Sequence, residues 1–225
     1  MDKDRTSTHQ PTHQVANTWY DDFQVWLTEE QSLHNAQLVA NHFAGSDWTR
    51  ASISAMLGNM RHESSINPNM YEYGYAWEDD RGYGLVQWTP RSKYWDWAVA
   101  NGLPPERGES QLARIDYEVE HNIQWIATEE IEWLSFEEFR TNARGWTVAK
   151  LTEAFTWGYE RPNRQAGEDS MPGRIAFAEL AYETLDFEGG TPGTPGDPGE
   201  QEQMPYFVIR RHSTNMRRMG MRGRR

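Results

Sequence analysis

The chain has 225 residues, and we expect one folded domain of about 150–190 residues with a tail at each end. It contains no cysteine, which excludes a disulfide framework and a Cys/His peptidase mechanism. The net charge of −12 is uneven, because residues 1–200 carry −18 and residues 201–225 carry +6. The acidic body argues against nucleic-acid binding, and only the basic end favours an anionic partner.

Both ends of the chain differ in composition from the centre. Residues 1–30 are predicted to form an N-terminal arm, polar at first and then carrying a short helix over 15–27. Residues 188–203 alternate Gly and Pro with small polar residues, which is typical of a linker. Residues 204–225 form a basic tail that is either disordered or docked on a partner. No apolar run approaches the ~20 residues of a membrane span, and no secretion signal is recognisable.

Between these ends, apolar periodicity predicts a mostly helical domain over residues 31–187. The predicted helices cover 29–44, 46–63, 92–100, 111–128, 147–159 and 171–187, with a short mixed helix or turn over 130–140. Aromatic residues at 71, 73, 75 and 77 alternate with polar or small ones, which is the period of a strand. We therefore expect an α+β fold in which residues 69–88 form a small β-region or an irregular lobe.

The helix that ends near Glu63 is unusual. Ser46 or Asp47 is expected to cap its start, and Glu63 follows Met56 by seven residues and Met60 by three, on the same apolar face. Desolvation and the negative end of the helix dipole favour the protonated form of a carboxyl group in such a position. A carboxylic acid that keeps its proton near neutral pH can protonate a leaving-group oxygen, as glycosidases require. The alternative is a glutamate that turns to solvent at a frayed helix end.

Two motifs give this glutamate a context. Residues 58–68 read GNMRHESSINP and residues 82–90 read GYGLVQWTP, which closely resembles the phage tail lysozyme family. Ser92-Lys93-Tyr94, Trp97-Ala98 and Tyr159-Glu160-Arg161-Pro162 extend the resemblance, which spans roughly Leu33 to Leu185. The Glu-Ser pair and the Gly-Leu-x-Gln run are also similar to goose-type lysozymes and lytic transglycosylases. The resemblance implies a lysozyme-like fold whose cleft is bordered by residues 69–88.

The resemblance makes Glu63 the expected general acid and leaves the second carboxylate of the cleft open. Our order of preference is Asp79, then Asp80, then Glu72, although each also fits a solvated charge in a turn. Expected substrate-contacting residues are Ser64, Tyr83, Gln87, Trp88 and Glu72, with Trp88 equally suited to the core. Glu160 either borders the cleft or, preferably, pairs with an arginine. No cofactor is expected, and no His/Asp/Glu cluster has zinc-hydrolase spacing.

These observations predict a virion-associated muramidase. It would cut the β-1,4 bond between N-acetylmuramic acid and N-acetylglucosamine in bacterial peptidoglycan, so that a phage tail passes the wall during genome ejection. The alternatives are a lytic transglycosylase with the same acid, or a structural tail protein whose lysozyme-like domain only binds glycan or packs. A free endolysin is a weaker alternative. Other tail proteins are expected to bind through the arm and residues 204–225, whose arginines also suit contact with packaged DNA.

Overall fold

The computed structural model describes residues 18–187, so the linker, the basic tail and the first 17 residues of the arm lie outside the described residues. The described chain is mostly helical, as expected. Its helices are α1 (Glu29–Phe43), α2 (Arg50–Ser64), α3 (Ser92–Ala100), α4 (Gly108–Glu120), the 3-10 turn η1 (Glu129–Ile131), α5 (Phe136–Arg140), α6 (Val148–Phe155), the π-helical turn η2 (Thr156–Glu160) and α7 (Arg164–Thr184). Within residues 18–187, no helix has both the length and the apolar character needed to span a membrane.

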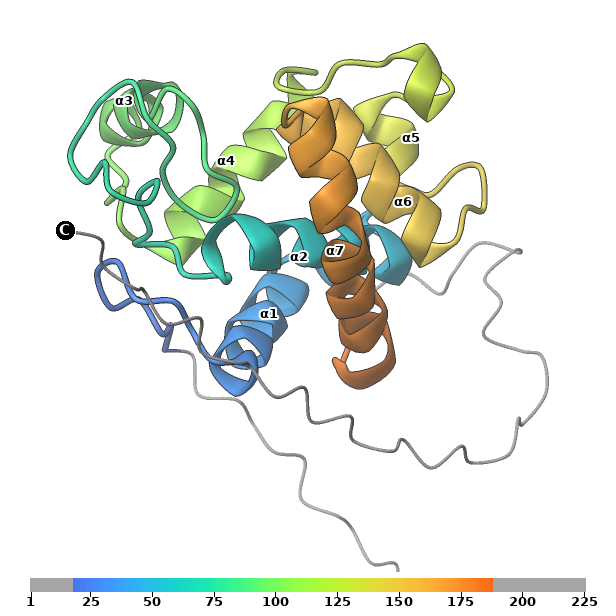
Figure 1. Cartoon of the computed structure of the whole chain (residues 1–225), viewed down its shortest axis with the longest axis horizontal. Coiled ribbons are helices and arrows are strands. Elements are labelled where there is room, and N and C mark those ends of the chain that lie inside the picture. The colour runs from blue at the N-terminus through green and yellow to red at the C-terminus, as the bar shows by residue number, and fades with distance from the viewer. Residues whose placement is uncertain (1–17, 188–225) are drawn as a thin grey trace, which may run out of the picture.

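Helix α2 is the centre of the fold. It crosses the middle of the molecule, and its residues from Ala51 to Met60 are all buried (Figure 1). A helix that is covered on every side belongs to a core. Its close approach to α7 depends on Gly58, where an added Cβ would lie 2.3 Å from the carbonyl oxygen of Arg174. Glu63 is thus carried by the most enclosed helix of the molecule.

The start of α2 differs from the prediction. Thr49, not Ser46 or Asp47, is the N-cap, and its hydroxyl accepts a hydrogen bond from the amide of Ser52 at 3.2 Å. Ser46 instead donates its hydroxyl to the carbonyl oxygen of Phe43, and Asp47 lies 3.3 Å from Arg140. Both residues that were expected to cap the helix form their contacts from the loop that precedes it.

Residues 69–88 form an irregular lobe rather than a β-region. Within the described residues there is no strand, and this segment holds only two isolated bridges, Tyr71 with Tyr83 and Tyr83 with Trp88. The alternating aromatic residues lie on successive turns, because Gly74 and Trp77 adopt positive φ angles that an extended strand does not allow. The β part of the predicted α+β fold is therefore not observed.

Several predicted helices have other limits. The described part of segment 15–27 is a turn with extended flanks, and its Trp19 donates its indole N–H to Glu109. Helix α4 begins at Gly108 instead of residue 111, and it ends at Glu120 instead of residue 128 because Asn122 and Gln124 have positive φ angles. In both segments the apolar pattern predicts a longer helix than the structure contains, because the pattern continues through residues that form turns.

The largest differences lie around residue 160. Helix α6 ends at Phe155, and the predicted helix to residue 159 continues as the π-helical turn η2. Helix α7 begins at Arg164, seven residues before the predicted start, with Asn163 as its N-cap and Pro172 inside it. These changes place Glu160 at the end of a π turn, an arrangement that is often found at functional sites.

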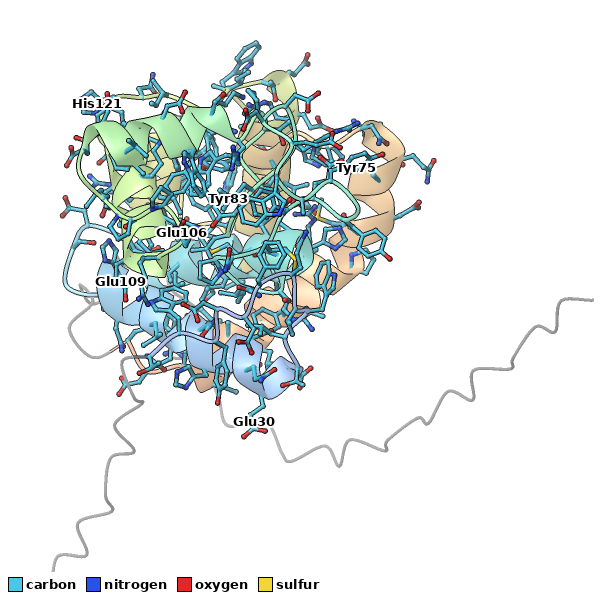
Figure 2. The ribbon with its side chains drawn as sticks, turned by 90° about the vertical axis from the view of Figure 1, so that its left-hand side faces the viewer. Glu30, Tyr75, Tyr83, Glu106, Glu109 and His121 are labelled. Atoms are coloured by element: carbon cyan, nitrogen blue, oxygen red, sulfur yellow. The ribbon has the colours of Figure 1, made fainter. Side chains whose placement is uncertain are left out.

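Aromatic side chains fill the core on both sides of α2. On the side of α3 and α4, Tyr83 packs against Tyr71 and Trp95, and it lies within the body of the molecule, whereas Glu30 and His121 lie on its outline (Figure 2). On the other side, Trp125 stacks on Phe136 with ring centroids 5.0 Å apart. The two packed sides leave the C-terminal end of α2 facing a cavity.

Candidate active site

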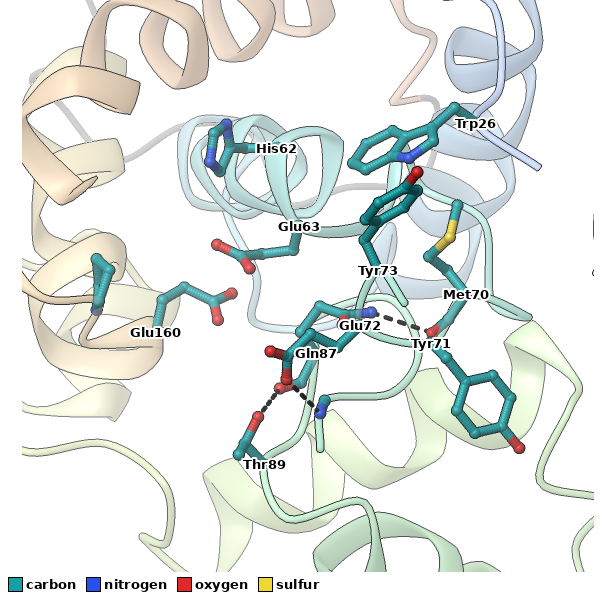
Figure 3. A pocket seen from close by; sticks show the side chains of 12 residues that line it. Trp26, His62, Glu63, Met70, Tyr71, Glu72, Tyr73, Gln87, Thr89 and Glu160 are labelled. Atoms are coloured by element: carbon teal, nitrogen blue, oxygen red, sulfur yellow. Dashed lines mark hydrogen bonds between the residues drawn. The ribbon is translucent and has the colours of Figure 1, made fainter. Parts of the chain in front are cut away.

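A cavity of about 510 Å³ lies beside the C-terminal end of α2. Glu63 reaches it from α2, and Glu160 reaches it from the turn η2. Figure 3 shows the two carboxyl groups directed into the same space. The irregular lobe supplies the opposite wall, with Gln87 among its residues. The prediction that residues 69–88 border a cleft beside Glu63 agrees with this geometry.

Glu63 is paired with an arginine that the sequence analysis did not foresee. The Nη2 atom of Arg174 donates to Oε1 of Glu63 at 2.5 Å. Arg174 is 2% exposed and the side chain of Glu63 is 20% exposed, so the pair stands at the boundary between core and cavity. An ion pair of this kind stabilises negative charge on the carboxyl group. The desolvation argument for a protonated Glu63 omitted this partner.

Asn59 fixes the position of Arg174. Its side-chain oxygen accepts hydrogen bonds from Nη1 of Arg174 and from the hydroxyl of Thr156, each at 2.8 Å. Its amide donates to the carbonyl oxygens of Ala55 and Thr152. These residues belong to α2, α6, η2 and α7. The polar network that joins the four elements therefore holds the guanidinium of Arg174 beside Glu63.

Glu160 lines the cavity and does not form the arginine pair that we preferred for it. No ion pair to Glu160 occurs within residues 18–187, and its Oε1 atom is enclosed without a hydrogen-bond partner. The neighbouring Arg161 donates Nη1 to the carbonyl oxygens of Gly158 and Tyr159 instead. Burial and the nearby charge of Glu63 raise the pKa of Glu160 well above the usual carboxyl range. These surroundings favour the protonated form of Glu160.

Two of the predicted site residues form the wall of the cavity. Gln87 donates its amide to the carbonyl oxygens of Met70 and Gly84, so the side chain is fixed against the lobe. Glu72 accepts a hydrogen bond from the amide of Gly82 and lies 3.6 Å from Arg81. Both line the cavity, and their contact with substrate stays a prediction.

Three other predicted contacts lie behind the wall. Ser64 is buried and donates to the carbonyl oxygens of Met60 and Leu85, which ties α2 to the lobe. Tyr83 and Trp88, expected as rings that stack on sugar, are both buried in the aromatic core. The indole N–H of Trp88 donates to Glu118 at 3.0 Å. The structure thus assigns these two rings to packing, because tertiary contacts enclose them from all sides.

The predicted second carboxylates Asp79 and Asp80 do not line the cavity. Asp79 is 77% exposed and forms an ion pair with Arg91. Asp80 is exposed in the same turn. Their position fits the alternative that the sequence analysis kept open, a solvated charge in a turn.

Trp26, His62 and Tyr73 are among the residues that line the cavity without having been predicted from the sequence. Trp26 is 52% exposed and Tyr73 is 87% exposed, so their rings are free to stack on a sugar face. His62 borders the same cavity, and burial together with the charge of Arg174 lowers its pKa. For Tyr73, the aromatic alternation was visible in the sequence, but it did not indicate which rings would be exposed.

The chain matches the phage tail lysozyme family over residues 34–185. It belongs to that family. The matched region contains Glu63, Arg174 and Glu160 and confirms the resemblance on which the site was predicted.

The chain is also similar to "Morphogenesis protein 1" of Bacillus phage B103, with 37% identity over 167 residues. That alignment covers 74% of this chain and 43% of the relative, so the chain spans less than half of the relative's length. Both comparisons link the chain to phage proteins, and the family match adds the likeness to lysozyme. Within the described residues, no group of three or more His, Asp or Glu side chains is arranged to hold a metal ion.

Proposed function

We propose that the chain is a glycosidase that cleaves bacterial peptidoglycan at the cavity beside α2. The observation that carries the proposal is a pair of carboxyl groups, Glu63 and Glu160, facing one cavity in a member of the phage tail lysozyme family. Glycoside cleavage normally uses two carboxyl groups that flank the bond. The exposed rings of Trp26 and Tyr73 add surfaces suited to sugar.

The bond that we propose is the β-1,4 bond after N-acetylmuramic acid, with Glu63 as the group that protonates the leaving oxygen. Hydrolysis and lytic transglycosylation both need that proton and differ in the attacking hydroxyl. Water as the attacking group gives a reducing end, whereas the C6 hydroxyl of the sugar gives a 1,6-anhydro end. Mass spectrometry of the soluble fragments distinguishes the two reactions.

Exchange of Glu63 tests the function. Glu63→Gln should lower the release of fragments from purified peptidoglycan by about 10²–10⁴-fold, the usual range for loss of an acid or base. Glu179→Gln, which removes the same charge from an exposed position on α7, should keep wild-type activity. If the wild-type protein releases no fragments from peptidoglycan of several wall types, the glycosidase proposal is wrong and a glycan-binding or packing role replaces it.

We further propose that the protein acts from the phage tail during genome ejection. The family description and the name of the morphogenesis relative both support a virion part. Protein mass spectrometry of purified particles should find the chain in the tail fraction. Its presence only in the lysate would favour a free endolysin instead.

A further inference from the structure

The candidate for a new role is Glu160, a carboxyl group of the cavity to which the proposed function assigns no step of its own. Its Oε1 atom is enclosed and has no hydrogen-bond partner in the described part of the chain, although the residue lines the cavity. Buried polar atoms are nearly always satisfied, so an exception calls for a physical reason. The π-helical turn that ends at Glu160 fixes its position, and Figure 3 shows its carboxyl group directed toward the space that Glu63 also faces.

The cations near Glu160 can balance the negative charge of only one of two carboxyl groups, that of Glu63 or that of Glu160. The charged residues near it are Glu63 on α2, Arg174 on α7, Glu118 on α4 and the adjacent Arg161. Arg174 is engaged by Glu63 and Asn59, and Arg161 is engaged by backbone carbonyl oxygens. His62 also lines the cavity, and burial together with the charge of Arg174 lowers its pKa.

Two carboxyl groups that face the same cavity oppose each other's ionisation. Arg174 compensates the charge of Glu63, whereas burial and the charge of Glu63 oppose ionisation of Glu160. Of the two carboxyl groups, Glu63 forms the ion pair with Arg174, and Glu160 is the one whose protonated form the surroundings favour.

We propose that Glu63 and Glu160 share one proton, and that Glu160 is a positioning residue that holds this proton until Glu63 delivers it to the glycosidic oxygen. The inference rests on the proposed glycosidase function. In the reaction, the C1–O bond breaks and its electron pair stays on the leaving oxygen, which receives the proton. The attacking hydroxyl, from water or from C6 of the sugar, bonds to C1 and returns its own proton to the carboxyl pair.

The pH profile of kcat/KM tests the shared proton. In Glu160→Gln the neutral side chain is kept but the stored proton is lost, so Glu63 must take a proton from solvent beside Arg174. The alkaline limb of the profile should move to lower pH by about one unit or more. At pH values above the shifted limb, activity should then fall roughly tenfold for each pH unit of the shift. Glu160→Asp keeps a titrating carboxyl group and should keep the limb near the wild-type position.

Two results would overturn the proposal. An unchanged alkaline limb in folded Glu160→Gln would give Glu160 a packing role alone. Loss of activity at every pH in a folded protein would make Glu160 the direct donor, acting without Glu63. Circular dichroism and thermal unfolding establish that each variant is folded before its profile is compared.

The pH dependence of stability gives a readout that needs no turnover. Because the folded protein raises the pKa of Glu160, it binds the proton more tightly than the unfolded chain does. The contribution of Glu160 to the free energy of unfolding is fully present below the usual carboxyl pKa. This contribution is lost as pH rises toward the raised pKa of Glu160. Glu160→Gln should remove this loss, whereas Glu179→Gln should retain it.

This second readout separates the two proposals. If peptidoglycan is not cleaved but Glu160→Gln flattens the stability curve, the glycosidase function fails and the proton is still located on Glu160. If peptidoglycan is cleaved and neither the curve nor the alkaline limb changes, the function stands and the shared proton is refuted.

Discussion

Glu118 on α4 and Glu160 at the end of η2 are nearby carboxyl groups that differ in their partners. Glu118 accepts hydrogen bonds from Arg114 at 2.8 Å, from Trp88 at 3.0 Å and from the Tyr159 hydroxyl at 2.5 Å. Glu160, the next residue after Tyr159, lines the cavity with an enclosed oxygen that has no donor in the described chain. Burial is the leading cause of a raised pKa at both.

The comparison shows that a raised pKa does not by itself indicate a reacting group. Burial raises the pKa of a carboxyl group in a structural network as well as in an active site. What distinguishes Glu160 is its place in the lining of an open cavity and an enclosed Oε1 atom that has no donor within residues 18–187. Glu118 should therefore control stability, and Glu160 should control the proton used in the reaction.

The largest effect on stability is expected at Glu118. Glu118→Ala leaves the buried Arg114 without its ion pair and removes the acceptor of Trp88 and Tyr159. Loss of one partner from a buried ion pair costs roughly 3–5 kcal/mol. Urea unfolding monitored by tryptophan fluorescence measures the change. A loss below about 1 kcal/mol would mean that the network is relaxed in solution and that the comparison with Glu160 does not hold.

A smaller effect is expected at Tyr159, the residue that joins the two carboxyl sites. Tyr159→Phe removes only the hydroxyl that donates to Glu118, and we expect a loss of about 1–3 kcal/mol. Because this hydroxyl points to Glu118 and away from the cavity, the alkaline limb of the activity profile should not move. A shift of that limb would show that the two carboxyl groups are coupled and would weaken the separation of their roles.

The sequence was informative where local rules decide the structure. Thr147, the first residue of the helix predicted over 147–159, is the N-cap of α6, and Glu63 lies in the last turn of α2 as expected. Such positions depend on spacing and capping within one segment. The family resemblance, and not local spacing, placed Glu63 beside the predicted cleft before any tertiary contact was known.

Local rules could not reveal the partners of Glu63. Arg174 lies 111 residues away in the chain, and no spacing pattern connects the two. The alternation of Tyr71 and Tyr73 fits a strand, yet tertiary packing buries the first ring and exposes the second. Burial of Tyr83 and Trp88 likewise depends on neighbours such as Trp95 and Glu118, which are distant in sequence. The candidate site therefore required the fold.

The smallest effect is expected at Asp79, the sequence-based choice for the second carboxylate. Asp79 lies outside the cavity lining, and it pairs with Arg91, whose guanidinium also donates to the Tyr71 hydroxyl at 3.1 Å. Exposed ion pairs contribute about 0–1 kcal/mol, so Asp79→Asn should change stability by no more than that. Because Glu160 provides the second carboxyl group in our proposal, activity should stay within about twofold of wild type.

Initial rates on purified peptidoglycan measure this variant beside Glu78→Gln, a neighbouring charge change in the same turn. A hundredfold loss confined to Asp79→Asn would mean that the ion pair with Arg91 opens when substrate binds and that Asp79 enters the cleft. Glu63 would then react opposite Asp79, and the enclosed carboxyl of Glu160 would serve the fold alone. Equal, near-wild-type rates for both variants leave Glu160 and Glu72 as the carboxyl groups that line the cavity with Glu63, and of these two our proposal uses Glu160.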